Sequence, residues 1–197
     1  MFVKQVEVGG MAIFAYLVAC KITNEALFID PAAETDRLLK EAQSRGYTIK
    51  YIVNTHSHGD HTIGNKRMKE LTGAQIIIHE DDAQGIIHQP LQMIAAMGGE
   101  PSPPADILVK DGDLITIGET SLKVIHTPGH SPGGMCLYHN GMVFTGDTLF
   151  VGAVGRTDLG GGSWEVLSSS IRNRLFTLPD ETVVAPGHNY GDAPKST

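Results

Sequence analysis

The sequence predicts an α/β protein in which two mixed β-sheets pack face to face with helices on the outside. Short apolar segments separated by turn residues occur in two runs, and each run is followed by a helical pattern. The chain has 197 residues, 41% of them hydrophobic and 19% charged, which is enough for a sizeable globular core. No short repeat or linker divides it, so we expect a single domain over residues 1–197.

The first run of strands begins at the N-terminus. Gly9-Gly10 and Thr23-Asn24 are turn signals between apolar segments, and Gly46 follows the first helical pattern as a natural C-terminal stop. The next apolar strand delivers the first histidine-rich block onto a loop. The predicted strands are 2–8, 12–20, 25–30, 49–54 and 75–79, and the predicted helices are 35–45 and 65–71.

The second run follows a Gly- and Pro-rich segment at 98–106, which we expect to be a loop. Its predicted strands are 114–117, 121–126, 135–139, 142–145 and 182–185. Residues 152–162 contain five glycines and predict an ordered loop over a site. A helix should begin after Ser163, which is a good N-cap, with Glu165 in its first turn. The apolar face of this helix is expected to consist of Trp164, Leu167, Ile171 and Leu175.

Charge and hydropathy exclude several classes of protein. The net charge of −7 argues against nucleic acid as the main partner, because phosphate binding favours a basic surface. No apolar run reaches membrane-spanning length, and the apolar stretch 11–20 lacks a preceding basic segment, so it is expected to be a buried strand. Cys20 and Cys136 are expected to be reduced and buried, as in a cytoplasmic protein.

Five histidines and two aspartates fall in four short blocks, each just after a predicted strand. The blocks are 55–61 (Thr-His-Ser-His-Gly-Asp-His), 127–130 (Thr-Pro-Gly-His), 146–148 (Gly-Asp-Thr) and 186–188 (Pro-Gly-His). Imidazole and carboxylate together suit zinc, manganese or iron(II). Seven such groups exceed the needs of one tetrahedral ion, but they are enough for two ions about 3.5–4 Å apart that share a carboxylate.

The spacing assigns these side chains to two ions. His56 and His58 alternate, so a loop can aim both at the first ion, with His130 completing its set. Asp60 and His61 are placed for the second ion, which His188 would complete, and Asp147 can bridge the two. We therefore expect two divalent ions, zinc or iron, with manganese as a third option. Asp60 and Asp147 are expected to be the catalytic carboxylates.

The order His-x-His-x-Asp-His, then His, Asp and His, resembles the metallo-β-lactamase superfamily over essentially the whole chain. The resemblance implies an αββα sandwich with the metal ions at one edge of the sheets. It also implies the same division of ligands between the two ions. In relatives, an Asp at the place of Asp30 supports a ligating histidine. A turn-capping role for Asp30 is the alternative. His126, four residues before His130, is expected either to support a ligand or to be structural.

Two branches of this superfamily share motifs with the chain. Residues 126–133 (His-Thr-Pro-Gly-His-Ser-Pro-Gly), 144–150 (Phe-Thr-Gly-Asp-Thr-Leu-Phe) and 186–190 (Pro-Gly-His-Asn-Tyr) are similar to the glyoxalase II group, which implies hydrolysis of a glutathione thioester by metal-bound hydroxide. Residues 155–158 (Gly-Arg-Thr-Asp) instead resemble the persulfide dioxygenases. That resemblance implies one iron held by the equivalents of His56, His130 and Asp147.

The resemblance also implies residues that bind the substrate. Arg156 falls where glyoxalase II relatives carry a basic residue that meets a glutathione carboxylate, and a surface arginine is the alternative. Tyr190 is expected either to line the pocket or to pack in the core. Glyoxalase II enzymes have a further C-terminal helical domain that contributes to the glutathione site. This sequence ends nine residues after His188 and lacks that domain, so other thioesters, lactones and esters remain alternative substrates.

Together these features predict a metal-dependent hydrolase that cleaves a small-molecule thioester or glutathione conjugate. An iron-dependent persulfide dioxygenase acting on glutathione persulfide is the main alternative. β-Lactam hydrolysis is disfavoured because true lactamases usually break the histidine pattern of the second ion, and nuclease relatives carry an inserted domain. A binding or scaffold role without catalysis would require the loss of a ligand, and all seven are present.

Overall fold

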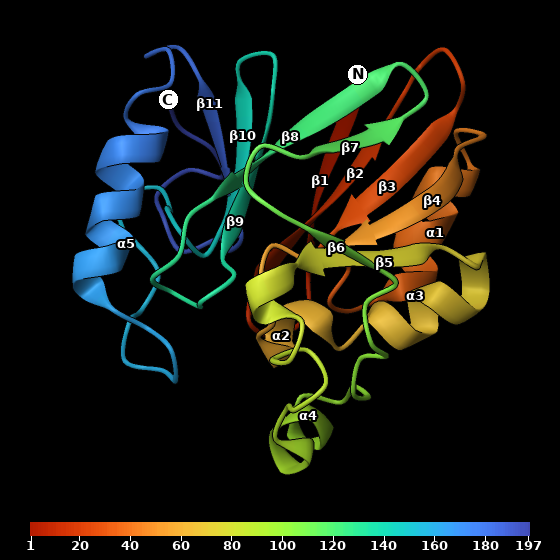
Figure 1. Cartoon of the computed structure of the whole chain (residues 1–197). Coiled ribbons are helices and arrows are strands. Elements are labelled where there is room, and N and C mark those ends of the chain that lie inside the picture. The colour runs from red at the N-terminus through yellow and green to blue at the C-terminus, as the bar shows by residue number, and fades with distance from the viewer.

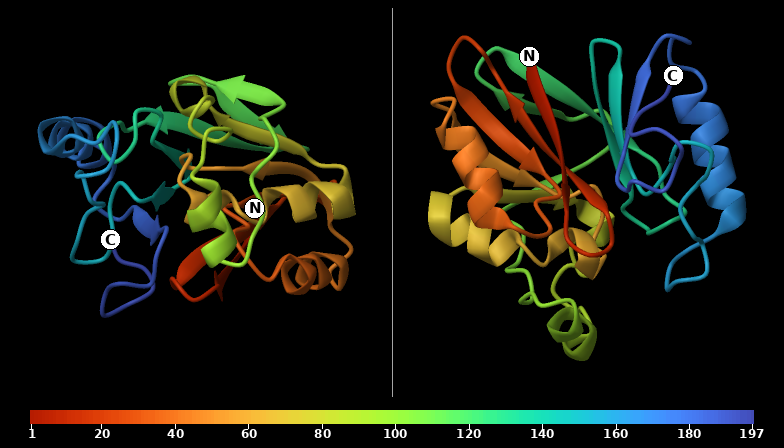
Figure 2. Two further views of the ribbon diagram at one scale, coloured as in Figure 1. Left: turned by 90° about the horizontal axis from the view of Figure 1, so that it is seen from below. Right: turned by 180° about the vertical axis from the view of Figure 1, so that it is seen from behind.

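The computed structural model describes residues 1–197 and contains two β-sheets packed face to face between outer helices (Figures 1 and 2). One sheet has six strands in the order β1-β2-β3-β4-β5-β6, and the other has five in the order β11-β10-β9-β8-β7. Both sheets mix parallel and antiparallel pairs. The αββα fold predicted from the sequence is confirmed.

The six-stranded sheet is antiparallel through its first three strands and parallel from β3 onward. Its strands are β1 (Phe2–Val8), β2 (Ile13–Ala19), β3 (Glu25–Ile29), β4 (Thr48–Val53), β5 (Gln75–His79) and β6 (Ile107–Val109). Helices α1 (Thr35–Gln43) and α3 (Asn65–Thr72) cover its outer face (Figure 1). The sequence predicted all of these elements to within two residues except β6, which is too short to show a period.

The five-stranded sheet consists of β7 (Leu114–Ile117), β8 (Thr120–His126), β9 (Met135–His139), β10 (Met142–Gly146) and β11 (Val183–Pro186). Helix α5 (Trp164–Ser170) continues into a π-helical turn, Ile171–Leu175, and lies outside this sheet (Figure 1). The Ser163 hydroxyl caps α5 by accepting a hydrogen bond from the Val166 amide at 3.3 Å. The prediction that Trp164 belongs to the buried face of this helix is wrong, because the residue is 53% exposed.

Strand β2 shows how the layers are held together. All seven of its residues are buried, because one face contacts the other sheet and the opposite face contacts the helices. Phe14, Tyr16 and Val18 belong to the core between the sheets. Ala15 and Leu17 belong to the core under α1 and α3. The expectation of a buried strand at this position is therefore confirmed, and a run without polar residues is its sequence signature.

Three short helical segments lie at the end of the sheets to which β4, β5 and β10 lead. They are α2 (Gly59–Thr62), a single 3-10 turn at Glu80–Asp82, and α4 (Leu91–Ala96), which projects beyond the body of the molecule in Figure 1. The sequence did not predict them, because segments of three to six residues carry no helical period. Every helix of the fold is too short or too polar to span a lipid bilayer. Cys20 and Cys136 are both buried and unpaired.

Candidate metal centre

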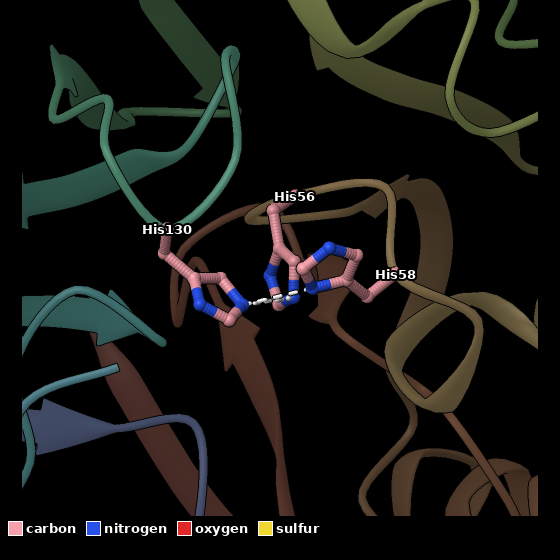
Figure 3. A group of neighbouring side chains, drawn as sticks. All are labelled: His56, His58 and His130. Atoms are coloured by element: carbon pink, nitrogen blue, oxygen red, sulfur yellow. Dashed lines mark hydrogen bonds between the residues drawn. The ribbon is translucent and has the colours of Figure 1, made fainter. Parts of the chain in front are cut away.

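The first group of possible ligands consists of His56 and His58, from the loop after β4, and His130, from the loop after β8 (Figure 3). The Nε2 atom of His130 lies 2.8 Å from Nδ1 of His58 and 3.2 Å from Nε2 of His56. In a tetrahedral zinc site the ligand nitrogens are about 3.3–3.4 Å apart, given Zn–N bonds of about 2.0–2.1 Å. The three ring nitrogens therefore converge as the ligands of one cation would.

The second group consists of Asp60, His61 and His188. Asp60 and His61 belong to the single turn of α2, whereas His188 follows β11. The Nε2 atoms of His61 and His188 are 3.1 Å apart, and Oδ2 of Asp60 lies 3.8 Å and 3.6 Å from them, respectively. Two buried imidazoles and one half-buried carboxylate thus face a common point.

Asp147 lies between these two groups. Its Oδ1 is 3.3 Å from Nε2 of His61, and its Oδ2 is 3.6 Å from Nε2 of His130 and 3.4 Å from Nε2 of His188. Oδ1 is buried, and no hydrogen bond reaches it. A buried carboxylate oxygen without a donor is costly unless a cation compensates it, so the donor set fits two cations joined by Asp147.

Backbone carbonyls orient two of the histidines. Nδ1 of His130 donates to the carbonyl oxygen of Arg156 at 2.8 Å, and Nδ1 of His188 donates to that of Met11 at 2.9 Å. A proton on Nδ1 leaves the lone pair on Nε2, which is the atom that points into the centre in both residues. These contacts select the tautomer that binds a metal ion.

Asp30 supports one histidine in each group. Its Oδ2 accepts hydrogen bonds from Nδ1 of His61 at 3.0 Å and from the Thr55 hydroxyl at 2.7 Å. The Thr55 hydroxyl oxygen is in turn 3.1 Å from Nδ1 of His56. The backbone of Asp30 is left-handed, with φ of 47°, a conformation that Asp tolerates better than most residues. Of the two roles considered for Asp30, support of a histidine is the one that these contacts favour.

A second buried carboxylate, Asp82, joins the two loops that carry the first ligand group. Its Oδ2 accepts hydrogen bonds from the Ser57 amide and the Ser131 hydroxyl, both at 2.8 Å. Its Oδ1 accepts one from the Gly133 amide at 2.7 Å. The sequence analysis missed Asp82. An acidic residue directly after the buried strand β5, whose end lies at the same edge as the histidine blocks, was the signal that could have identified it.

We expect Asp82→Asn to weaken metal binding by the first ligand group by about 10- to 100-fold, the usual cost of losing a residue that orients ligands. An amide has one acceptor oxygen where three donors converge, so at least one donor loses its partner. Competition with a chromogenic chelator would measure the affinity. The neighbouring Asp81→Asn, at a side chain that is 52% exposed, is the matched control and should bind metal normally. Equal affinities for the two variants would contradict this role.

The two ligand groups differ in protonation. Burial, together with the neighbouring imidazoles, lowers the pKa of His56 well below its usual value and that of His58 to about 4. Burial also disfavours the charged form of His61, but the carboxylates of Asp147, Asp60 and Asp30 outweigh it and hold its pKa well above the usual value. Near neutral pH, His56 and His58 of the first group are therefore already neutral, whereas His61 in the second must first release a proton.

Metal affinity should consequently depend on pH in two ways. For the second group, affinity should rise with pH by up to about tenfold per unit below the pKa of His61, since one proton is displaced. For the first group it should change less steeply, because two of its three imidazoles, His56 and His58, are already neutral and release no proton on binding. Calorimetric zinc titrations between pH 5.5 and 8, in buffers of different ionisation enthalpy, would measure affinity and proton release together. Two binding events with the same pH dependence would contradict this expectation.

The structure brings all seven sequence-predicted ligands together, and it places the two expected substrate residues at the surface nearby. The guanidinium of Arg156 is exposed and forms two 2.7 Å contacts with Asp158, whose pKa the hydrogen bonds from Arg156 lower to about 2. The ring of Tyr190 stacks on His188 at 4.4 Å between centroids. Core packing of Tyr190 is excluded, because the residue is 56% exposed.

His126 lies apart from the two ligand groups, in a third group with His79 and Asp81. Its ring stacks on that of His79 at 3.9 Å, and its Nε2 donates to the Pro132 carbonyl at 2.9 Å. Asp81 lies close to both rings, and its amide donates a hydrogen bond to Nδ1 of His79. One ring nitrogen of each histidine in this third His/Asp group therefore already has a protein partner.

A two-sheet sandwich with histidines and aspartates converging at one edge defines a class of metal-dependent enzymes. The chain belongs to the metallo-β-lactamase superfamily, whose family model matches residues 8–188. This match spans every strand from β2 to β11 and all four ligand blocks.

Curated relatives include members of both branches suggested by the motifs. The chain is 38% identical over 181 residues to a hydroxyacylglutathione hydrolase of Polaromonas sp., covering 90% of this chain and 62% of the relative. It is 34% identical over 184 residues to the human mitochondrial persulfide dioxygenase ETHE1, covering 90% and 64%, respectively. It therefore spans less than two thirds of both relatives. The probable metallo-hydrolase YqgX of Bacillus subtilis is 32% identical over 189 residues, covering 94% of this chain and 89% of the relative.

Solved structures that resemble this chain also carry names from different branches of the superfamily. ETHE1 from Myxococcus xanthus superposes with a TM-score of 0.86 at 30% identity, covering 100% of this chain and 79% of that one. The BLEG-1 B3 metallo-β-lactamase gives 0.88 at 31% identity, covering 100% and 94%. TTHA1623, solved in a di-iron-bound form, gives 0.84 at 33% identity, covering 98% and 94%. A similar chain of nearly the same length therefore holds two metal ions.

Proposed function

We propose that the protein is a binuclear metallohydrolase that cleaves small-molecule thioesters. The observation that carries this proposal is the position of Asp147, whose two carboxylate oxygens face different ligand groups while one of them has no donor. Similarity to hydroxyacylglutathione hydrolases supports a thioester as the substrate class. In the reaction, the oxygen of a water molecule bonds to the thioester carbonyl carbon, the C–S bond breaks, and the thiolate leaves to be protonated.

Each ligand residue has a distinct task in this proposal. One cation would be held by His56, His58 and His130. The other would be held by Asp60, His61 and His188, and Asp147 would bind both cations. When bound, the two cations lower the pKa of a water molecule to near neutrality and polarise the substrate carbonyl.

The protein maintains the charge and shape of the site. Burial alone would raise the pKa of Asp147, but the neighbouring His61 and His188 hold it well below the usual range, so this carboxylate stays charged. His58, Asp60 and Tyr190 are more exposed than the other histidines of the centre, and they mark the side from which a substrate would approach.

A persulfide dioxygenase is the second candidate. It is favoured by residues 155–158 and by the similarity to the ETHE1 proteins of human and Myxococcus xanthus. Two histidines and one aspartate on one face of an iron ion leave positions open for oxygen, and His56, His130 and Asp147 form such a set.

One experiment separates the two candidates. Protein purified with and without air is analysed for zinc, iron and manganese, and each sample is assayed for thioester hydrolysis and for oxygen uptake with glutathione persulfide. A β-lactam serves as a third substrate. The proposal expects two ions per chain and thioester turnover without oxygen consumption. A single iron, with oxygen uptake that depends on persulfide, would reject it in favour of the dioxygenase.

We expect Arg156→Ala to raise KM several-fold for a glutathione thioester and to leave kcat unchanged. The reason is that the Arg156 side chain would bind a part of the substrate that does not react. In the structure Asp158 occupies the guanidinium, so Asp158→Ala should have the opposite effect and lower KM. The control is Arg172→Ala, which removes an exposed arginine from the π-helical turn. Steady-state kinetics should show no change in KM for this variant. An unchanged KM for Arg156→Ala would show that this arginine is only a surface residue.

A further inference from the structure

An apolar pocket of about 290 Å³ borders the second ligand group. It lies between the turn that joins β1 to β2 and the end of α4, and Asp60 forms part of its wall. The carboxylate of Asp60 connects it directly to the candidate metal centre. Most of the lining is apolar, and the residues are Gly9, Gly10, Met11, Ile13, Ala32, Ala33, Asp60, Ile63, Ala96 and Met97.

Close packing ties both walls of the pocket to the ligand residues. On one side, a Cβ atom at Gly59 would lie 2.5 Å from Cδ1 of Ile94, so the absence of a side chain there lets α4 sit directly on α2. On the other side, the carbonyl of Met11 accepts the hydrogen bond from Nδ1 of His188. The pocket therefore has a defined position relative to Asp60 and His188.

The charge of the pocket restricts what can occupy it. Asp60 is the one charged residue in the lining, and α4 has the uncharged sequence Leu-Gln-Met-Ile-Ala-Ala. Two arginines on the same side of the fold are already paired, Arg37 with Glu34 and Arg67 with Asp36. Carboxylates and phosphates bind best to arginine or lysine. If the thiol part of a substrate carried such groups, they would find no unpaired arginine beside this pocket. The lining therefore favours an uncharged occupant.

We infer that this pocket binds the apolar acyl chain of the substrate, and that the protein prefers thioesters of alkyl carboxylic acids. This inference rests on the proposed function and adds the substrate class. With the acyl chain between Met11 and Met97, the thioester carbonyl lies beside Asp60, and the thiol portion is left outside the pocket. Methionine side chains are flexible and adapt to chains of different length.

The test uses thioesters of one small uncharged thiol, N-acetylcysteamine, with acetyl, butyryl and hexanoyl groups on the zinc-loaded protein. Burial of each methylene should raise kcat/KM by about fourfold until the pocket is full. Ala96→Trp places an indole in the pocket and should abolish this gain. The matched variant Ala95→Trp, at the adjacent exposed position outside the lining, should retain it. Equal rates along the series, or equal behaviour of the two variants, would overturn the inference.

Binding measured without turnover separates this inference from the proposed function. Calorimetric titration should show that hexanoate binds more tightly than acetate to the wild-type protein and to Ala95→Trp, but not to Ala96→Trp. If no thioester is hydrolysed and this difference persists, the proposed function fails and the pocket assignment stands. If thioesters are hydrolysed but the two acids bind equally, the pocket assignment fails alone.

Discussion

Replacing Asp147 with alanine should reduce kcat by roughly 10³-fold or more, on the scale of removing one member of a catalytic unit. Metal content should fall from two ions per chain to one or none. The reason is geometric, since this carboxylate faces Nε2 atoms from both ligand groups and none of the other six ligands lies between them. Metal analysis and thioester kinetics on the same preparation would measure both effects.

Two variants make the Asp147 result specific. Asp147→Asn keeps the shape and one oxygen but removes the charge, so we expect intermediate metal content. Asp192→Ala removes a carboxylate from the exposed loop after His188 and should leave metal content and kcat unchanged. Wild-type metal content in Asp147→Ala would show that this residue does not bridge two ions.

Asp30→Asn should lower metal affinity by about 10- to 100-fold, although Asp30 would not touch either metal ion. Three donors meet its two oxygens, namely the Thr55 amide, the Thr55 hydroxyl and Nδ1 of His61. An amide presents its NH₂ group to at least one of them, and a buried donor without a partner costs about 1–3 kcal/mol of stability. Zinc titration and urea unfolding would measure these losses.

A matched substitution tests whether position or charge matters at Asp30. Asp36→Asn removes an exposed carboxylate that pairs with Arg67. It should change neither the zinc affinity nor the free energy of unfolding appreciably. A loss of stability in Asp30→Asn with unchanged metal affinity would make Asp30 a structural residue with no part in orienting His61.

Much of the candidate site could be predicted because its residues follow strands. The blocks after β4, β8, β10 and β11 are adjacent to strong apolar segments, and a strand that is buried on both faces has a clear signature. Loops at the same edge of packed sheets converge. Residue type and position in the sequence were therefore enough to predict that these seven side chains lie close together. The spacing of His-x-His-x-Asp-His also separated them into two groups.

Other features depend on contacts that no local pattern carries. Asp82 reaches Ser57 across 25 residues and Gly133 across 51, so its role exists only after the end of β5 has met the loops that follow β4 and β8. Trp164 has the spacing of a core residue, yet it lies in the first turn of α5, where the helix has not reached the sheet. Helical periodicity identifies a face but not how far along the helix that face is covered.

The class of fold, the family and the seven candidate ligands could be predicted from the amino-acid sequence, because hydrophobic period and ligand chemistry are properties of short segments. The other features of the site depend on how the chain folds. It showed which nitrogen of each histidine is available, that Asp30 and Asp82 hold the ligand loops, and that Asp158 occupies Arg156. It also revealed an uncharged pocket beside Asp60. Each of these depends on distances between segments far apart in the chain, and those distances are set by packing.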